Sequence, residues 1–219
     1  MTSAATPVST PREPELLGQT VVVIGGSAGI GLETARRARA EGADVILTGR
    51  NPERLQRAAR ELGARSTAAF DATDPAPLEQ FMHDLPTPID HVMVTAGRPR
   101  YGRLVDMDPA EARRALGEHL VVALQVARGP LPALVASLAL ELAPVRVNLI
   151  AAGYVDTPLS ASLLGAELAH RRAELRATLP IRRVVEPTDV AALAVHVMIN
   201  TALTGATYDI DGGQQLLAG

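Results

Sequence analysis

The sequence contains no cysteine, and all 21 of its basic residues are arginine, so lysine is absent as well. Without cysteine, the chain forms no disulfide, uses no thiolate as a nucleophile and offers no cysteine ligand to zinc. Aromatic residues make up only 2% of the chain, although hydrophobic residues make up 47%. We therefore expect a core of Val, Leu, Ile and Ala, as in parallel sheets covered by helices.

The chain also lacks a strong charge of either sign and any long apolar run. Its formal net charge of −3 gives no electrostatic case for a nucleic acid or a membrane surface as partner. No apolar run approaches the roughly 20 residues of a membrane span. Residues 1–16 are polar and proline-rich, without the apolar core of a signal peptide, so we expect a flexible arm there and a cytoplasmic protein.

Short apolar runs alternate with helical patterns over residues 17–219, which we interpret as one domain. The predicted strands cover residues 20–24, 43–47, 66–70, 89–94, 145–150 and 206–210. The predicted helices cover residues 32–40, 75–84, 109–128, 131–142 and 187–199, with one more opening at Asn51-Pro52 and a looser helical stretch at 160–178. This alternation predicts an α/β fold: a single-domain, doubly wound parallel sheet of the Rossmann type, with helices on both faces.

The glycine-rich turn between the first predicted strand and the first predicted helix is the most informative segment. Gly25, Gly29 and Gly31 follow the buried run 20–24 and precede the helical pattern 32–40. A strand, a turn and a helix in this order direct the free N–H groups of the first helical turn toward the end of the strand, where they favour a pyrophosphate. Glycine allows the phosphates and the helix to approach the sheet closely. The turn therefore predicts a dinucleotide site.

Further motifs follow the turn in a recognisable order. They are Phe-Asp-Ala-Thr-Asp at 70–74, Val-Thr-Ala-Gly at 94–97, Arg-Val-Asn at 146–148, Ala-Gly at 152–153, Thr-Pro at 157–158 and Asp-Gly-Gly at 211–213. With these motifs the chain resembles the short-chain dehydrogenase/reductase family over essentially all of residues 17–219. The resemblance implies hydride transfer between a nicotinamide cofactor and a small carbonyl or alcohol substrate.

The resemblance also implies roles for individual residues. Asp71 is expected to contact the adenine amine, and Thr157 to hold the nicotinamide carboxamide. The whole predicted cofactor-binding set is Gly25, Ser27, Gly29, Ile30, Gly31, Arg50, Asp71, Ala72, Ala96, Gly97 and Thr157.

Arg50 bears on the choice between the two nicotinamide cofactors. NAD-preferring relatives end the second strand in an acidic residue, but Gly49 stands there in this chain. Arg50 can pair with a 2′-phosphate bidentately, and Ser27 can add a hydroxyl contact, whereas Ala28 stands where many NADP-binding relatives carry a second basic residue. We therefore expect NADP(H) to be preferred and NAD(H) to remain possible. The alternative is that Arg50 is a solvated surface residue.

The residues that carry the family's chemistry do not appear. The resemblance implies a Ser on the fifth strand and a Tyr-x-x-x-Lys pair, but none of Tyr101, Tyr154 and Tyr208 has a lysine four residues on. The family's Asn in the preceding helix aligns with His119, which gives this residue a candidate role in proton relay, the alternative being a packed or solvated histidine. The other histidines show no metal-ligand spacing, so no metal site is predicted.

The connection between the two predicted helices 109–128 and 131–142 is too short for this fold. In a doubly wound sheet both helices run in roughly the same direction, and the first is about 30 Å long. Gly129-Pro130 spans at most about 7 Å. We expect that about 30 residues, a strand with its loops, are omitted there. The alternative is a true helical hairpin at 129–130.

Two functions and one assembly follow as expectations. The first function is an NADP(H)-dependent oxidoreductase, and the second is a dinucleotide-binding sensor or partner subunit that keeps the fold without catalysis. The predicted helix 131–142 is apolar nearly all round, which indicates burial on more than one side. We therefore expect a homodimer or homotetramer through the helices 109–128 and 131–142. The alternative is that the apolar rows of both helices face the chain's own sheet.

Overall fold

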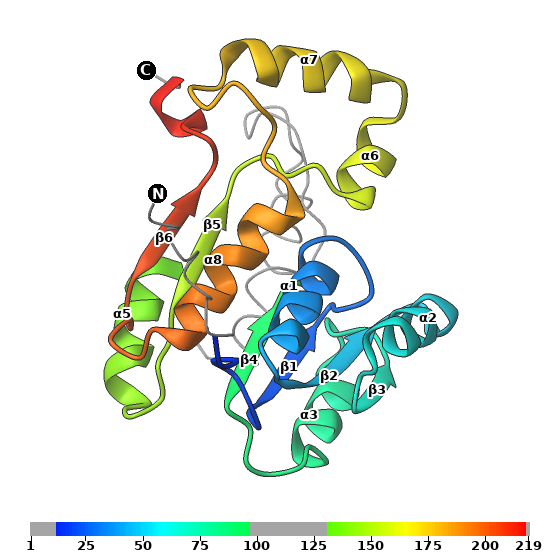
Figure 1. Cartoon of the computed structure of the whole chain (residues 1–219), viewed down its shortest axis with the longest axis vertical. Coiled ribbons are helices and arrows are strands. Elements are labelled where there is room, and N and C mark those ends of the chain that lie inside the picture. Colours follow the sequence, from blue (N-terminus) through cyan, green and yellow to red (C-terminus); the bar gives the residue numbers. More distant parts are fainter. Residues whose placement is uncertain (1–11, 97–130, 218–219) are drawn as a thin grey trace, which may run out of the picture.

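A computed structural model of the chain describes residues 12–96 and 131–217. Six strands lie in these two stretches, all in parallel pairs (Figure 1). A four-stranded sheet has the order β3-β2-β1-β4, and a two-stranded sheet pairs β5 with β6. The strands are β1 (Thr20–Ile24), β2 (Asp44–Gly49), β3 (Ser66–Ala69), β4 (His91–Val94), β5 (Leu149–Ala152) and β6 (Thr207–Ile210).

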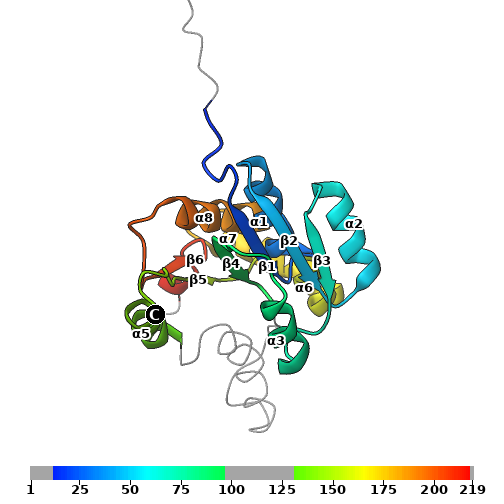
Figure 2. The same ribbon diagram turned by 90° about the horizontal axis from the view of Figure 1, so that it is seen from below.

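Helices cover both faces of the strands, as the view from below shows (Figure 2). One face carries α1 (Gly29–Ala40), α2 (Pro52–Leu62) and α8 (Pro187–Ile199). The other carries α3 (Pro75–His83) and α5 (Leu131–Glu141). Beyond the carboxyl ends of the strands lie α6 (Pro158–Leu164) and α7 (Leu168–Thr178), with short 3₁₀ turns at Gly165–Glu167 and Gln214–Leu217.

β1 is the centre of the first core. Its residues are fully buried, and they alternate between two clusters. Val21 and Val23 pack with residues of α1, α2 and α8, whereas Val22 and Ile24 pack with Leu78 of α3. Because both faces of the strand are covered, an unbroken β-branched run is the sequence that fits it.

The predicted doubly wound α/β class is confirmed, but its strands form two hydrogen-bonded sheets instead of one. In the described part of the chain no strand is paired between β4 and β5. Val92 in β4 is 37% exposed. Helix α8 joins the two sheets, since Val195 packs into the core beside α1 while Val190 packs with Ile150 of β5.

The start of β5 corrects a predicted boundary. The run 145–150 predicts a strand, yet β5 begins only at Leu149. The preceding backbone is held instead by side chains, because the Arg146 guanidinium donates to four carbonyls at the end of α8 and beyond it, and the Asn148 amide donates to the carbonyl of Leu203 at 2.9 Å.

The amino-terminal boundary also lies earlier than expected. Leu16, placed in the flexible arm by the sequence pattern, is fully buried, and its N–H donates to the carbonyl of Glu41 at 2.9 Å. The ordered chain therefore includes residues before 17. The predicted helix 109–128 with His119, as well as Gly97, Tyr101 and the Gly129-Pro130 junction, lies outside the described residues.

Candidate dinucleotide-binding site

A cleft of about 810 Å³ opens at the carboxyl ends of the strands. Residues at the ends of β1, β2, β4 and β5 line it, so both sheets contribute. Ligands of open α/β sheets bind at this edge. The structure brings together every predicted cofactor-binding residue that it describes, namely Gly25, Ser27, Gly29, Ile30, Gly31, Arg50, Asp71, Ala72, Ala96 and Thr157.

The glycine turn packs too closely against its surroundings for side chains. A Cβ at Gly25 would lie 2.8 Å from the Thr95 hydroxyl and 2.9 Å from the Ala96 nitrogen. A Cβ at Gly31 would overlap the carbonyl oxygen of Gly25. Either side chain would push the turn, helix α1 and the end of β4 apart. These glycines therefore set how closely α1 approaches the sheet.

The first turn of α1 presents an uncapped helix end to the cleft. Ala28 is the N-cap residue and offers no side-chain hydrogen bond, and the first turn contains no acidic residue. Gly29, Ile30 and Gly31, which form that turn, line the cleft. The N–H groups of such a turn, together with the helix dipole, attract an anion. The donor set fits the pyrophosphate of a dinucleotide.

Two arginines lie at the end of the cleft beside β2. Arg50 follows the strand directly, and its Nη1 is 4.0 Å from a carboxylate oxygen of Asp71. Arg54, on the first turn of α2, donates from Nε to the hydroxyl oxygen of Ser27 at 3.3 Å. Both arginines line the cleft. Arg54 is not among the residues predicted from the sequence, although the Asn51 N-cap that orients the start of α2 is visible there.

Asp71 orders the turn that follows β3. One of its carboxylate oxygens accepts hydrogen bonds from the Thr73 N–H at 3.0 Å and from the Thr73 hydroxyl at 2.8 Å. Ala72, beside it, is 6% exposed and packs with Leu78 in the core under α3. The carboxylate is thereby held at the wall of the cleft near Arg50.

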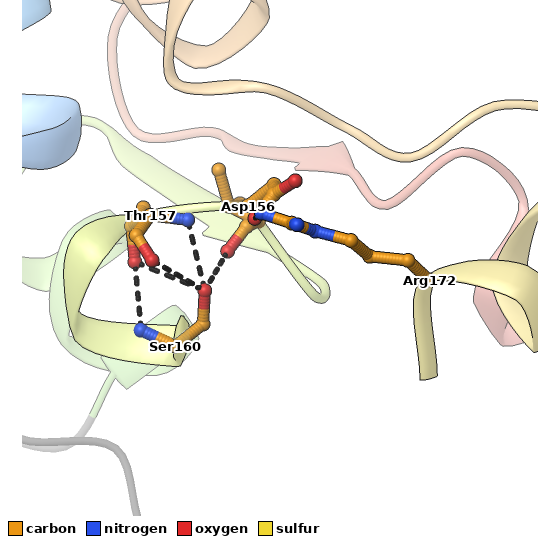
Figure 3. A network of polar contacts seen from close by, with 5 residues as sticks. Asp156, Thr157, Ser160 and Arg172 are labelled. Carbon is orange, nitrogen blue, oxygen red and sulfur yellow. Dashed lines mark hydrogen bonds and ion pairs between the residues drawn. The ribbon is translucent and has the colours of Figure 1, made fainter. Parts of the chain in front are cut away.

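Thr157 lies on the opposite side of the cleft, at the start of α6 (Figure 3). Its hydroxyl oxygen accepts the N–H of Ser160 at 3.0 Å, and its own N–H donates to the Ser160 hydroxyl at 2.8 Å. The Ser160 hydroxyl is buried and donates to the carbonyl of Val155 at 3.0 Å. This reciprocal capping fixes the helix start. The Thr157 methyl carbon lies within van der Waals reach of a Cβ built at Gly29, so the two sides of the cleft meet there.

An ion pair connects α7 to the segment after β5. The Arg172 guanidinium donates to the Asp156 carboxylate at 2.8 Å (Figure 3), and this hydrogen bond raises the pKa of Arg172 above its ordinary value. Neighbouring Tyr154 is 5% exposed and packs with Leu175 and Leu179. Tyr154 does not line the cleft, and neither does Tyr208 of β6. Among the described residues, then, no tyrosine is placed to exchange a proton in the cleft.

No group of three or more His, Asp or Glu side chains in the described stretches is arranged to hold a metal ion. None of the helices in the same stretches is long and apolar enough to cross a membrane.

Family models cover nearly the whole chain. The model described as short chain dehydrogenase matches residues 19–136, and the model described as enoyl-(acyl carrier protein) reductase matches residues 90–215. The chain belongs to the short-chain dehydrogenase/reductase family. This confirms the resemblance drawn from the sequence motifs, and it assigns the chain to a family of oxidoreductases.

Similar proteins include several characterised oxidoreductases. The NADP-dependent (R)-specific alcohol dehydrogenase of Lentilactobacillus kefiri is 27% identical over an alignment that covers 90% of this chain and 97% of the relative. The galactitol 2-dehydrogenase of Cereibacter sphaeroides is 29% identical, with 90% and 94% covered. Among solved structures, the MalC reductase/Diels-Alderase of Malbranchea aurantiaca superimposes with a TM-score of 0.79 at 22% identity, over 93% of this chain and 99% of that chain. The last of these shows the shared fold.

The length of these alignments bears on the predicted omission. The alignment with the Lentilactobacillus enzyme runs over 247 positions, more than the 219 residues of the whole chain. Gaps must therefore be opened in this chain to match that relative. That the missing residues belong between Gly129 and Pro130 stays a prediction.

Proposed function

We propose that this short-chain dehydrogenase/reductase binds NADP(H) and transfers hydride between the nicotinamide and a small carbonyl or alcohol. The observation that carries the proposal is the cleft itself, where an uncapped helix end, a glycine turn and two arginines meet. The nicotinamide supplies the hydride chemistry when it is bound, and the chain supplies binding and orientation. An NADP-dependent relative and NADPH-bound neighbours of the same fold support NADP(H), and a neighbour with bound NAD keeps NAD(H) open.

Each part of the cleft has a role in this proposal. The first turn of α1 and the glycine turn hold the pyrophosphate through backbone N–H groups. Arg50 pairs with the 2′-phosphate, Asp71 accepts from the adenine amine and Thr157 positions the carboxamide. Ala72 and Ala96 complete the walls as small residues that leave room for the ring systems, and a role for Gly97 in cofactor binding stays a prediction from the sequence.

The proton that accompanies hydride transfer needs a separate donor. Reduction of a carbonyl delivers hydride to carbon and requires a proton at oxygen, which a positioned acid supplies. The family's Tyr and Lys are absent from the sequence, and the tyrosines of the described stretches lie outside the cleft. His119 is the residue that the alignment of motifs offers for this task, and its role remains a prediction.

A second function has an observation in its favour. Because the sequence contains no lysine at all, no residue can provide the ammonium that the family places beside its tyrosine. A chain that binds the dinucleotide without turning it over would act as a sensor or as a partner subunit. The same cleft serves both functions, so binding alone does not separate them.

Binding and turnover measured on the same preparation separate the two functions. NADPH titrated by its fluorescence should bind in the micromolar range or tighter, and oxidation of NADPH at saturating cofactor should appear with a member of a ketone and aldehyde panel. Binding without any turnover would favour the sensor. Absence of binding by both NADPH and NADH would overturn both functions.

The proposal includes an assembly and a location, which the surface and the composition support. α5 buries Val135 and Leu138, yet Leu140 on its other side is 82% exposed, and Val145 just beyond is 60% exposed. An apolar face left uncovered on a helix that is already packed supports a homodimer or homotetramer through α5. The absence of cysteine supports the cytoplasm, and the small net charge gives no support to a nucleic-acid or membrane partner.

A further inference from the structure

Arg54 contacts the buried end of the glycine turn through Ser27. Its Nε–H donates to the Ser27 hydroxyl at 3.3 Å, and Ser27 is only 6% exposed. The four N–H groups on the two Nη atoms remain for a ligand. Within the described stretches no carboxylate lies within ion-pair distance of Arg54. Its charge is therefore held at the cleft wall without a protein counter-ion in those stretches.

Arg50 stands in a different electrostatic position. Its Nη1 is 4.0 Å from Asp71, so an anion in the cleft competes with a carboxylate for this guanidinium. Both side chains are about half exposed, at 51% and 48%, and water screens such a pair. Of the two arginines, Arg54 is the one that a hydrogen bond orients toward the glycine turn and that has no carboxylate within ion-pair distance in the described stretches.

The packing around Gly49 disfavours an acidic side chain at the end of β2, and with it a preference for NAD(H). A Cβ at this position would lie 2.9 Å from the Ser27 hydroxyl oxygen and 3.0 Å from the Ser27 Cβ. Any side chain at the end of β2 would therefore displace Ser27 and break its contact with Arg54. An acidic side chain at this position, which would accept a free ribose 2′-hydroxyl, is therefore disfavoured by the position that Ser27 takes here.

We propose that Arg54, held in place by Ser27, is the main determinant of the preference for a 2′-phosphate, with Arg50 contributing less. This inference rests on the proposed NADP(H) function and adds to it the residue that discriminates. A guanidinium that donates two N–H groups to a dianionic phosphate forms charge-assisted bonds stronger than those of a neutral donor.

The test compares the affinities of NADPH and NADH by fluorescence titration of the full chain and its variants. Arg54→Ala should lower the affinity for NADPH roughly tenfold to a hundredfold. It should change the affinity for NADH by less than about twofold, since NADH lacks the 2′-phosphate. Arg50→Ala should weaken NADPH by a smaller factor. Arg57→Ala is the matched control, because Arg57 is an exposed arginine of the same helix that does not line the cleft.

A double-mutant cycle tests the part played by Ser27. As a single substitution, Ser27→Ala should weaken the binding of NADPH. In the Arg54→Ala background it should weaken that binding little further, since the hydroxyl acts through the guanidinium. The same variants titrated with adenosine 2′,5′-bisphosphate and adenosine 5′-monophosphate isolate the phosphate from the rest of the dinucleotide. Equal circular dichroism spectra for Arg54→Ala and Arg57→Ala establish that both are folded.

The outcomes separate this inference from the function on which it rests. If Arg54→Ala costs no more NADPH affinity than Arg57→Ala, or less than Arg50→Ala, then Arg54 is not the main determinant, while the NADP(H) function stands. If the unaltered protein binds NADPH and NADH equally, the preference is absent and this inference is overturned, and if it binds neither, the proposed function is overturned as well. Full additivity of Ser27→Ala and Arg54→Ala would overturn the role given to Ser27.

Discussion

Arg146 connects the amino-terminal side of β5 to the end of α8, and its removal should be costly. Nη1 donates to the carbonyls of Val197, Asn200 and Leu203 at 2.8, 3.2 and 3.0 Å, and Nη2 donates to that of Met198 at 2.8 Å. Hydrogen bonds from a charged donor contribute about 1.5–3 kcal/mol each and do not add fully. When the arginine donor is lost, water molecules partly replace it as hydrogen-bond donors to these carbonyls at the helix end. We expect Arg146→Ala to lower the free energy of unfolding by about 3 kcal/mol.

Thermal and urea unfolding followed by circular dichroism measure this loss. For a domain of this size, 1 kcal/mol corresponds to about 2–4 °C in Tm, so a fall of roughly 6–12 °C is expected. Arg146→Lys should fall in between, because lysine keeps the charge at the helix end but not the planar fork. Arg176→Ala, at an exposed position of α7, should stay within about 0.5 kcal/mol of the unaltered protein. A Tm for Arg146→Ala equal to that of Arg176→Ala would refute the reasoning.

Three further predictions concern other parts of the fold. Burial, and then the charge of Arg146, lowers the pKa of His91 below its ordinary value of 6.5. Above pH 6.5 the imidazole is neutral in both the folded and the unfolded chain, and the stability is fully present. As the pH falls toward the folded pKa this stability is lost, because the unfolded chain takes up the proton first. His91→Gln should flatten that part of a pH series of urea midpoints, and an unchanged slope would exclude His91 as the cause. Gly31→Ala should lower Tm, since the added methyl overlaps the Gly25 carbonyl and overpacking costs about 1–3 kcal/mol, whereas a stabilised variant, as helix propensity alone predicts, would contradict the observed packing. Light scattering should report a mass above that of one chain, and Leu140→Arg should shift it toward the monomer; a monomer before the substitution would rule out an interface on α5.

Local sequence signals predicted the elements of the fold well where their causes are local. The β-branched run at Thr20–Ile24 becomes β1 without change, and the Asn51-Pro52 pair begins α2 as expected, with the Asn51 side chain accepting the N–H of Arg54. α8 begins at Pro187 after Glu186, as the sequence indicated. Alternation of strands and helices, together with the glycine turn, was sufficient for the fold class and for the place of the cleft.

The features that the sequence did not predict depend on contacts between distant segments. β5 begins late because Arg146 and Asn148 bind backbone groups more than 50 residues away, which no local window contains. Arg54 looked like any charged residue on an exposed helix until its distance to Ser27 was known. The alternating pattern predicted one parallel sheet with a strand omitted near 129–130, and among the described strands β4 and β5 are the edges of two separate sheets.

The cleft lies between the four-stranded sheet and the two-stranded sheet. One wall, with the glycine turn, Arg50 and Arg54, belongs to the four-stranded sheet, and the other wall, with Gly153 and Thr157, belongs to the segment that follows β5. In the described stretches no strand hydrogen bond crosses between them, and side-chain packing joins the two sides instead, chiefly of α8 along α1. A dinucleotide that contacts both walls would connect the two sheets at the cleft. A ligand held by both walls should therefore raise the free energy of unfolding as well as fill the cleft.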